Sequence, residues 1–315
     1  PQRAGGQRMK LGAIVPQGWT GEYDGREPSE AWARTVAVAR QAERLGFESI
    51  WLFDHFHTVP KPTDEITFES WVSLSALAAR TERVRLGHIV ICNGFRNPAL
   101  TAKMAGTLDV VSGGRFELGI GAGWKRDEWE AYGYGFPDTR SRLRMLEDGL
   151  EVITRMLGGA RHEHATFDGE HARVRDAINL PRGLQQPRIP IMVGGNGPNV
   201  TWRLAARFAD ELNLDALSPQ ELREALPVIR SRCEEIDRDP ASLRISLHAW
   251  WGDDDWREAG DRRIAYLGEL ADLGVHRVMG LLQDSATTDE ALEGLAEDAR
   301  AAGIELATVA GSAAR

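Results

Sequence analysis

The sequence predicts an α/β fold, a (β/α)₈ TIM barrel. Short, unbroken apolar runs alternate with amphipathic helical patterns along the chain of 315 residues, and we count eight of each. Eight such pairs in one chain are typical of a closed barrel of parallel strands. A doubly wound open sheet is the alternative, but eight parallel strands without an obvious chain reversal favour closure.

The first half of the chain contains four predicted strands. The second of them is an unbroken apolar run, which is typical of a parallel strand buried on both faces. These strands span residues 10–16, 50–53, 84–92 and 116–120. Apolar stripes of helical spacing follow them at 32–45, 69–80, 98–111 and 141–157. The third of these helices begins at Pro98, because proline suits a first helical position.

Residues 158–188 break this alternation and are predicted to be an inserted segment. Asp168-Gly169 stands between two short runs and predicts a small hairpin there. Regular order then resumes, with strands predicted at 190–193, 211–214, 243–249 and 275–279. Helical patterns follow at 202–206, 222–236, 264–271 and 292–295.

Composition indicates an ordinary soluble protein with one domain. The apolar share is 42% and the charged share 27%, and no linker divides the chain, so we expect a single domain at 9–315 after an extension or tag at 1–8. A net charge of −9 and a pI of about 5.5 argue against nucleic acid as a partner. With no long apolar run and only two cysteines, we expect no membrane contact, no disulfide framework and a cytoplasmic location.

The most informative polar residues follow the second predicted strand. Asp54, His55 and His57 come directly after the buried run 50–53. The carboxyl ends of parallel strands are where barrels of this kind place their chemistry, and histidine is suited to proton transfer near neutral pH. The alternative is that one or both histidines are ordinary loop residues.

Two glycine-rich turns also follow predicted strands. Gly121 lies in the turn after the fourth strand, where small residues let a planar ligand approach the backbone. Gly194, Gly195 and Asn196 lie after the fifth strand and open a helix, where backbone N–H groups favour an anion such as phosphate. Plain turns are the alternative in both places.

Cysteine and metal chemistry are not favoured. Cys92 ends the third strand without a histidine or acidic partner in the sequence, so a nucleophilic role is not expected. The spacing His55-x-His57 also occurs in metal-dependent barrels, but the later strand ends supply no histidine to complete a shell. We therefore predict no metal.

Several motifs in this sequence resemble those of the luciferase-like monooxygenase superfamily, and most of all its coenzyme F420-dependent branch. They are Leu52-Phe53-Asp54-His55, Arg96-Asn97-Pro98-Ala99-Leu100, Ser112-Gly113-Gly114-Arg115-Phe116, Gly119-Ile120-Gly121-Ala122-Gly123-Trp124 and Ile191-Met192-Val193-Gly194-Gly195. The resemblance implies a bacterial luciferase-like barrel with an insertion, a homodimer, and F420 as cofactor. FMN is the alternative cofactor.

The resemblance also implies roles for individual residues. His55 matches a catalytic histidine that acts on the substrate proton, and Asp54 and Asp127 match residues near the cofactor. Ile89 and Val90 match a pair joined by a non-prolyl cis peptide behind the deazaflavin ring. The remaining cofactor-binding candidates are Cys92, Gly121, Gly194, Gly195 and Asn196.

One departure from the resembling sugar-phosphate dehydrogenases bears on the substrate. Trp124 stands where those enzymes have a glutamate, so an apolar or aromatic substrate is expected, bound by Trp19, His57, Trp124 and Trp250. The predicted function is hydride transfer between C5 of the deazaflavin and an organic substrate. An FMN-dependent monooxygenase and a flavin-binding barrel without turnover are the alternatives.

Overall fold

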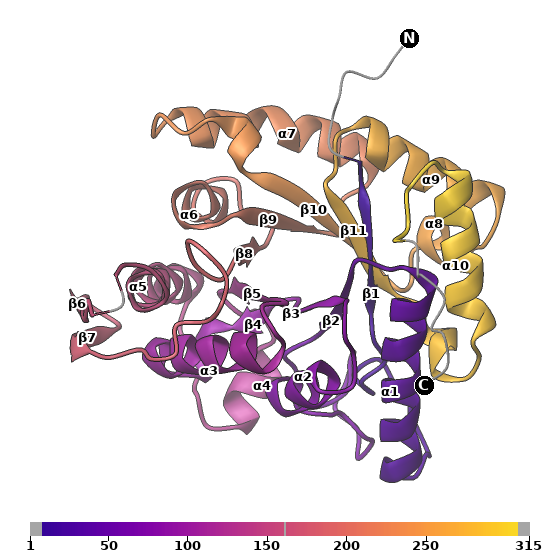
Figure 1. Cartoon of the computed structure of the whole chain (residues 1–315), viewed down its shortest axis with the longest axis horizontal. Coiled ribbons are helices and arrows are strands. Elements are labelled where there is room, and N and C mark those ends of the chain that lie inside the picture. The colour runs from indigo at the N-terminus through magenta and orange to yellow at the C-terminus, as the bar shows by residue number, and fades with distance from the viewer. Residues whose placement is uncertain (1–7, 161, 308–315) are drawn as a thin grey trace.

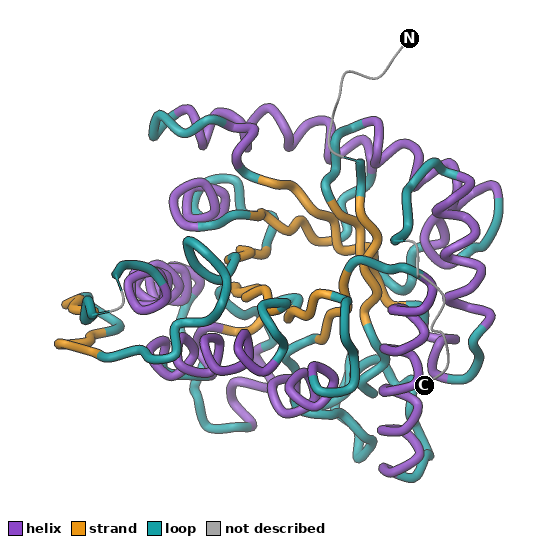
Figure 2. The backbone as a smooth tube through the Cα atoms, in the orientation of Figure 1, coloured by secondary structure: helices purple, strands orange, loops and turns teal. Residues whose placement is uncertain are grey.

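The computed structural model of the protein describes residues 8–160 and 162–307. In these ranges a ring of strands is surrounded by helices (Figure 1, Figure 2). The ring contains β1 (Lys10–Ile14), β2 (Ser49–Leu52), β3 (Arg85–His88), β4 (Ile91–Cys92), β5 (Phe116–Gly121), β8 (Ile191–Gly194), β9 (Glu211–Asp215), β10 (Arg244–Ala249) and β11 (Arg277–Leu281).

The strands form a closed parallel barrel. They pair in the order β3-β2-β1-β11-β10-β9-β8-β5-β4, and an additional pairing between β3 and β5 closes the ring. All pairings within the ring are parallel. The predicted (β/α)₈ barrel is therefore confirmed.

Helices pack around the outside of the ring (Figure 2). The longer ones are α1 (Pro28–Leu45), α2 (Ser70–Ala78), α3 (Pro98–Val111), α5 (Thr139–Leu157), α6 (Thr201–Phe208), α7 (Pro219–Glu234), α9 (Asp261–Asp272) and α10 (Glu290–Ala301). Shorter helical turns are α4 (Arg126–Ala131), α8 (Asp254–Arg257), η1 (Asn93–Phe95), η2 (Pro240–Ser242) and η3 (Gln283–Ala286). Within the described ranges, no helix combines the length and apolar character needed to cross a membrane.

The third strand departs from the continuous run predicted at 84–92. It is divided into β3 and β4, and the peptide bond between Ile89 and Val90 is cis, as expected from the resemblance. Leu86 pairs with Phe116, whereas Ile91 pairs with Ile120. Ile91 is five residues after Leu86, whereas Ile120 is only four residues after Phe116. The third strand therefore has one extra residue between β3 and β4, which is a β-bulge.

The inserted segment contains the predicted hairpin. Its strands β6 (Ala165–Asp168) and β7 (Arg173–Ala177) pair antiparallel and lie beside α5, away from the barrel strands (Figure 1). The extension expected at 1–8 lies outside the described residues apart from Arg8, which pairs with Glu305 at 2.6 Å. The single-domain organisation stays a prediction.

A buried ion cluster occupies the end of the barrel where the strands begin. Arg277 is 1% exposed, and its guanidinium lies 2.6 Å from Glu117, 2.7 Å from Glu211 and 2.9 Å from Glu48. It also lies over the ring of Trp51, 4.8 Å from the centroid. Burial opposes ionisation of Glu117, but the charge of Arg277 lowers the pKa of Glu117 to about 2.

We expect Arg277→Met to lower the free energy of unfolding by about 3–5 kcal/mol, because it removes the most buried cation of the cluster and leaves Glu117 and Glu211 with the partly exposed Arg85 and Arg244. The pKa of Glu117 is lower in the folded state than in the unfolded state. The ionised carboxylate therefore adds to the free energy of unfolding above pH 4.5, and this contribution is lost as the pH falls towards about 2. Urea unfolding at pH 7 and pH 4 should therefore show this pH dependence in the wild type and a smaller one in Arg277→Met, in which Arg85 still pairs with Glu117.

The matched control is Arg223→Met, which removes an arginine from an exposed pair with Glu269. Exposed pairs contribute about 0–1 kcal/mol, so this variant should unfold at nearly the wild-type urea concentration. Equal losses in both variants would contradict a special role for the buried cluster.

Candidate active site

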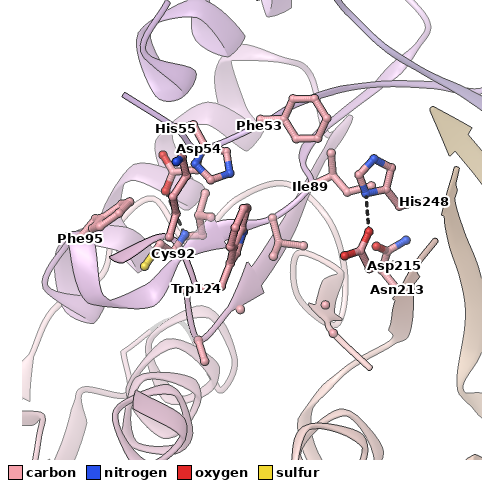
Figure 3. A pocket seen from close by; sticks show the side chains of 18 of the residues that line it. Phe53, Asp54, His55, Ile89, Cys92, Phe95, Trp124, Asn213, Asp215 and His248 are labelled. Atoms are coloured by element: carbon pink, nitrogen blue, oxygen red, sulfur yellow. Dashed lines mark hydrogen bonds and ion pairs between the residues drawn. The ribbon is translucent and has the colours of Figure 1, made fainter. Parts of the chain in front are cut away.

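A cavity of about 350 Å³ lies at the carboxyl ends of the barrel strands (Figure 3). This volume is in the range of small-molecule binding sites. The predicted site residues that line it are Trp19, Asp54, His55, Ile89, Val90, Cys92, Gly121, Trp124, Gly194, Gly195, Asn196 and Trp250. The fold therefore brings together residues that are far apart in the sequence.

Two predicted residues, His57 and Asp127, lie outside this lining. Asp127 pairs with Lys125 at 2.7 Å, and its pKa is lowered by that contact although partial burial opposes the shift. His57 Nδ1 lies 3.2 Å from the carbonyl oxygen of Thr58, and its Nε2 is buried without a partner among the described residues. Their proposed roles at the cofactor and the substrate stay predictions.

His55 is fixed by a buried carboxylate. Its Nδ1 lies 2.7 Å from Oε2 of Glu128, which comes from α4 and is fully buried. The other oxygen of Glu128 accepts a hydrogen bond of 3.0 Å from the backbone N–H of Phe56. Because a carboxylate only accepts, Nδ1 of His55 carries the proton, and Nε2 is the nitrogen left for a ligand in the cavity.

Asp54 uses both of its oxygens in hydrogen bonds within the protein. Oδ1 accepts from Ser70 Oγ at 2.8 Å and from Arg96 Nη2 at 2.9 Å. Oδ2 accepts from Arg96 Nη1 at 2.7 Å and from the backbone N–H of Cys92 at 2.9 Å. Burial opposes ionisation, but the charge of Arg96 keeps the pKa of Asp54 below its usual range. Asp54 is therefore suited to holding the site together rather than to moving a proton.

Cys92 is a buried, protonated thiol. Burial raises its pKa to about 12, so the reactive thiolate is not formed near neutral pH. A Cβ on Gly123 would lie 2.4 Å from its sulfur, so the thiol packs closely under the glycine turn. The absence of a nucleophilic role, expected from the sequence, agrees with this environment.

Two glycines leave room for the side chain of Val90 in one wall of the cavity. A Cβ on Gly121 would lie 2.9 Å from Val90 Cγ2, and a Cβ on Gly194 would lie 2.9 Å from Val90 Cγ1. Gly195 has a φ of +131°, which side-chain-bearing residues rarely adopt. The amide of Asn196 is bonded twice to the backbone of Asp215, at 2.7 and 2.9 Å, which fixes the loop that leads into α6.

Comparison with known proteins identifies the family. The profile of luciferase-like monooxygenases matches residues 9–314. The chain belongs to the luciferase-like monooxygenase family. The F420-dependent glucose-6-phosphate dehydrogenase of Kineococcus radiotolerans is 33% identical over 270 residues, which are 78% of this chain and 73% of the relative.

Solved structures of the family share the fold. An F420-dependent secondary alcohol dehydrogenase in complex with an F420-acetone adduct superposes with a TM-score of 0.74 at 18% identity, covering 91% of this chain and 99% of the other. The oxygenating constituent of 3,6-diketocamphane monooxygenase from Pseudomonas putida, in complex with FMN, has a TM-score of 0.71 at 16% identity and covers 92% and 98%.

In this family member, aromatic side chains surround His55. The ring of Trp19 stacks on the imidazole with a centroid distance of 4.0 Å and an interplanar angle of 2°. Trp124 approaches the imidazole edge-on at 5.9 Å and is 58% exposed, whereas Trp250 stacks on Trp251 at 3.9 Å. The mouth of the cavity is thus largely aromatic.

Charged groups around the cavity are already paired. Lys125 is the only lysine among the described lining residues, which include no arginine, and its ammonium donates to both oxygens of Asp127 at 2.7 and 3.0 Å. Asp54 is paired with Arg96, and Glu128 with His55. No described lining residue therefore offers a free cation to an anionic ligand.

Sequence reasoning missed several polar residues of this luciferase-like site, and three of them form histidine–carboxylate pairs. Glu128 lies on α4, which is too short for a helical stripe, although its position four residues after Trp124 at a strand end was a usable signal. His248 on β10 and Asp215 at the end of β9 also line the cavity. Only their positions at the ends of predicted strands could have indicated them.

We expect Glu128→Gln to disturb the ring of His55, because His55 Nδ1 and the Phe56 N–H bind different oxygens of Glu128, and an amide replaces one oxygen with an NH₂ group that cannot accept. The free energy of unfolding should fall by about 1–3 kcal/mol, the usual cost of a buried donor without an acceptor. Nitrogen-15 NMR of the imidazole should show that the Nδ1–H form no longer predominates.

Glu130→Gln on the same helix is the control, because Glu130 is exposed and its one ion pair among the described residues is with Arg126. Such a pair contributes about 0.2–0.5 kcal/mol, so the unfolding curve and the imidazole spectrum should stay close to those of the wild type. A wild-type imidazole spectrum in Glu128→Gln would refute the assignment of the Nδ1 proton.

Proposed function

We propose that this protein is an F420-dependent oxidoreductase that transfers hydride between C5 of the deazaflavin and an uncharged organic substrate. The observation that carries the proposal is His55, oriented by the buried Glu128 at the edge of a cavity with a glycine wall. The 33% identical relative is named as an F420-dependent enzyme, which supports the choice of cofactor. A hydride transfer also needs a group that gives or takes a proton, and His55 is suited to it.

The residues of the cavity fit a planar cofactor. Gly121 and Gly194 leave the wall beside Val90 without side chains, so a flat ring system can lie against it. The loop from Gly195 to the start of α6 presents backbone N–H groups and the hydroxyl of Thr201 for a phosphate. When bound there, F420 would supply the two-electron chemistry at its C5.

The chain's own residues account for the proton. As the hydride leaves a substrate carbon, the proton of the attached hydroxyl moves to Nε2 of His55, and in the reverse direction it returns. The imidazole then carries a positive charge, which the Glu128 carboxylate at 2.7 Å compensates. The face of Trp19, stacked at 4.0 Å, also stabilises a cation.

The charges of the cavity argue against a phosphorylated substrate. The relative is named for glucose 6-phosphate, whose phosphate group calls for cationic or strongly donating partners. Here the lining lysine is engaged by Asp127, and Trp124 occupies the cavity mouth. Aromatic walls formed by Trp19, Trp124 and Trp250 favour a ring-containing, uncharged substrate.

We also propose that the enzyme acts as a homodimer in the cytoplasm, as the family resemblance implies. Apolar side chains are exposed on α2 and α3, including Val72 at 74%, Leu100 at 52% and Val111 at 53%. Exposed apolar side chains on two helices that pack against each other are what an association surface would use. A second copy of the chain is the partner we propose for them.

Parallel titrations with F420 and with FMN test the choice of cofactor. The fold occurs with FMN in a structural neighbour, so FMN is the direct competitor. We expect saturable binding of F420, followed by its absorbance or fluorescence, and binding of FMN that is at least about tenfold weaker. Tighter binding of FMN would refute the proposal and favour a flavin-dependent monooxygenase.

We expect His55→Ala to lower turnover by at least about tenfold while F420 affinity stays within a few-fold, because a positioned acid–base group contributes about 10²–10⁴-fold. Steady-state kinetics at saturating cofactor and a cofactor titration measure the two effects. Unchanged turnover would remove His55 from the mechanism and leave His57 or water as the proton donor.

We expect Gly194→Ala to weaken F420 binding by about tenfold, because its Cβ would meet Val90 at 2.9 Å and push that side chain towards the ring site. The control is Gly268→Ala, since a Cβ there meets no atom within 4 Å. Fluorescence titration of both variants measures the effect. Equal affinities would mean that this wall does not contact the cofactor.

A further inference from the structure

A second histidine–carboxylate pair lines the same cavity. His248 Nδ1 lies 3.3 Å from Oδ1 of Asp215, and the pair appears on the opposite side of the view from His55 in Figure 3. The two residues come from β10 and from the end of β9, whereas His55 follows β2. The cavity therefore has an oriented imidazole on each of two walls.

One buried nitrogen of His248 has no hydrogen-bond partner among the described residues. The carboxylate of Asp215, 3.3 Å from Nδ1, favours the proton on that nitrogen, so a neutral imidazole presents a lone pair at Nε2. That Nε2 is buried and has no partner among the described residues. The rings of Phe53 and Trp250, with centroids 5.5 and 5.7 Å away, provide no strong donor to it. A buried acceptor without a hydrogen bond is unfavourable, so a hydrogen-bond donor on a bound ligand would stabilise this nitrogen.

A structural role does not account for the pair. The side chain of Asp215 is 53% exposed, and exposed ion pairs contribute little to stability. The position of Asp215 is already fixed by the two hydrogen bonds between its backbone and Asn196. The contact with His248 instead orients an imidazole that is 7% exposed and forms part of the cavity wall.

We propose that His248, oriented by Asp215, is a second substrate-binding residue, and that the substrate is an uncharged ring compound with a hydroxyl that donates to His248 Nε2. This inference rests on the proposed function, in which His55 acts at the reacting carbon. The ring of Phe53 lies 6.4 Å from the imidazole of His55 and 5.5 Å from that of His248, measured between centroids. A substrate ring against Phe53 would direct its reacting group to one histidine and its hydroxyl to the other.

A pair of inert probes tests the hydroxyl contact. 4-Ethylphenol and ethylbenzene have the same carbon skeleton, and only the first carries a hydroxyl donor. Calorimetry with the full chain, with and without F420, should show 4-ethylphenol binding about three- to tenfold more tightly. We call the dissociation constant of ethylbenzene divided by that of 4-ethylphenol the probe ratio. His248→Phe should reduce the probe ratio to about one, whereas His55→Phe should leave it largely unchanged.

Asp215→Asn provides a second test that does not alter the buried ring itself. Because Asp215 is more than half exposed at its side chain, we expect this variant to fold, and its probe ratio should fall at least about twofold. A wild-type ratio in both His248→Phe and Asp215→Asn would overturn the inference, as would a wild-type protein that shows no preference for 4-ethylphenol.

The F420 titration separates this inference from the proposed function. If F420 fails to bind but the probe ratio depends on His248, the proposed cofactor is wrong and the hydroxyl-binding role of His248 stands. If F420 binds and the ratio is independent of His248, only the role of His248 is wrong.

Discussion

The geometry of the active site depends on the buried carboxylate of Asp54. A charge removed from water persists only where it is paired and hydrogen-bonded, and Asp54 meets both conditions through Arg96, Ser70 and the backbone of Cys92. These partners come from the end of η1, from α2 and from β4. The hydrogen bonds of this one side chain thus connect the end of β2 to three other segments. Because His55 is the next residue, its backbone position is fixed by the same contacts.

Charge is used differently at the two ends of the barrel. Where the strands begin, the guanidinium of Arg277 lies among the carboxyl groups of Glu117, Glu211 and Glu48, and the opposite charges compensate one another. Where the strands end, Glu128 and Asp215 face imidazoles, whose charge changes when a proton is gained or lost. The ion cluster around Arg277 therefore supports the fold, and the titratable histidines line the cavity at the carboxyl ends of the strands, as is usual for barrels of this type.

Much of the fold and part of the site follow from local sequence pattern. Buried apolar runs predicted the strands, and the rule that chemistry lies at their carboxyl ends directed attention to His55, Gly121 and Gly194. The division of the predicted strand 84–92 was expected from the family resemblance alone, since its apolar pattern is continuous. Glu128 was missed because a six-residue helix carries too little periodicity. The pairing of Asp215 with His248 depends on neighbouring strands, and one-dimensional patterns do not contain that contact.

The two kinds of wall in the cavity would select substrates with unequal strength. Aromatic surfaces such as Trp124 and Trp250 bind a substrate more tightly when it has more apolar surface. A missing or extra methylene changes the binding free energy by only about 1–3 kcal/mol. A buried polar atom such as His248 Nε2 discriminates more sharply, because a ligand without a matching donor leaves that atom unpaired. The pairing of Lys125 with Asp127 also affects selection. The ammonium group is already bonded to a carboxylate, so it is not free to bind an anionic substrate. Under the proposed function, size would be selected loosely and hydrogen-bonding character strictly, so a few strand-end residues would decide the class of substrate.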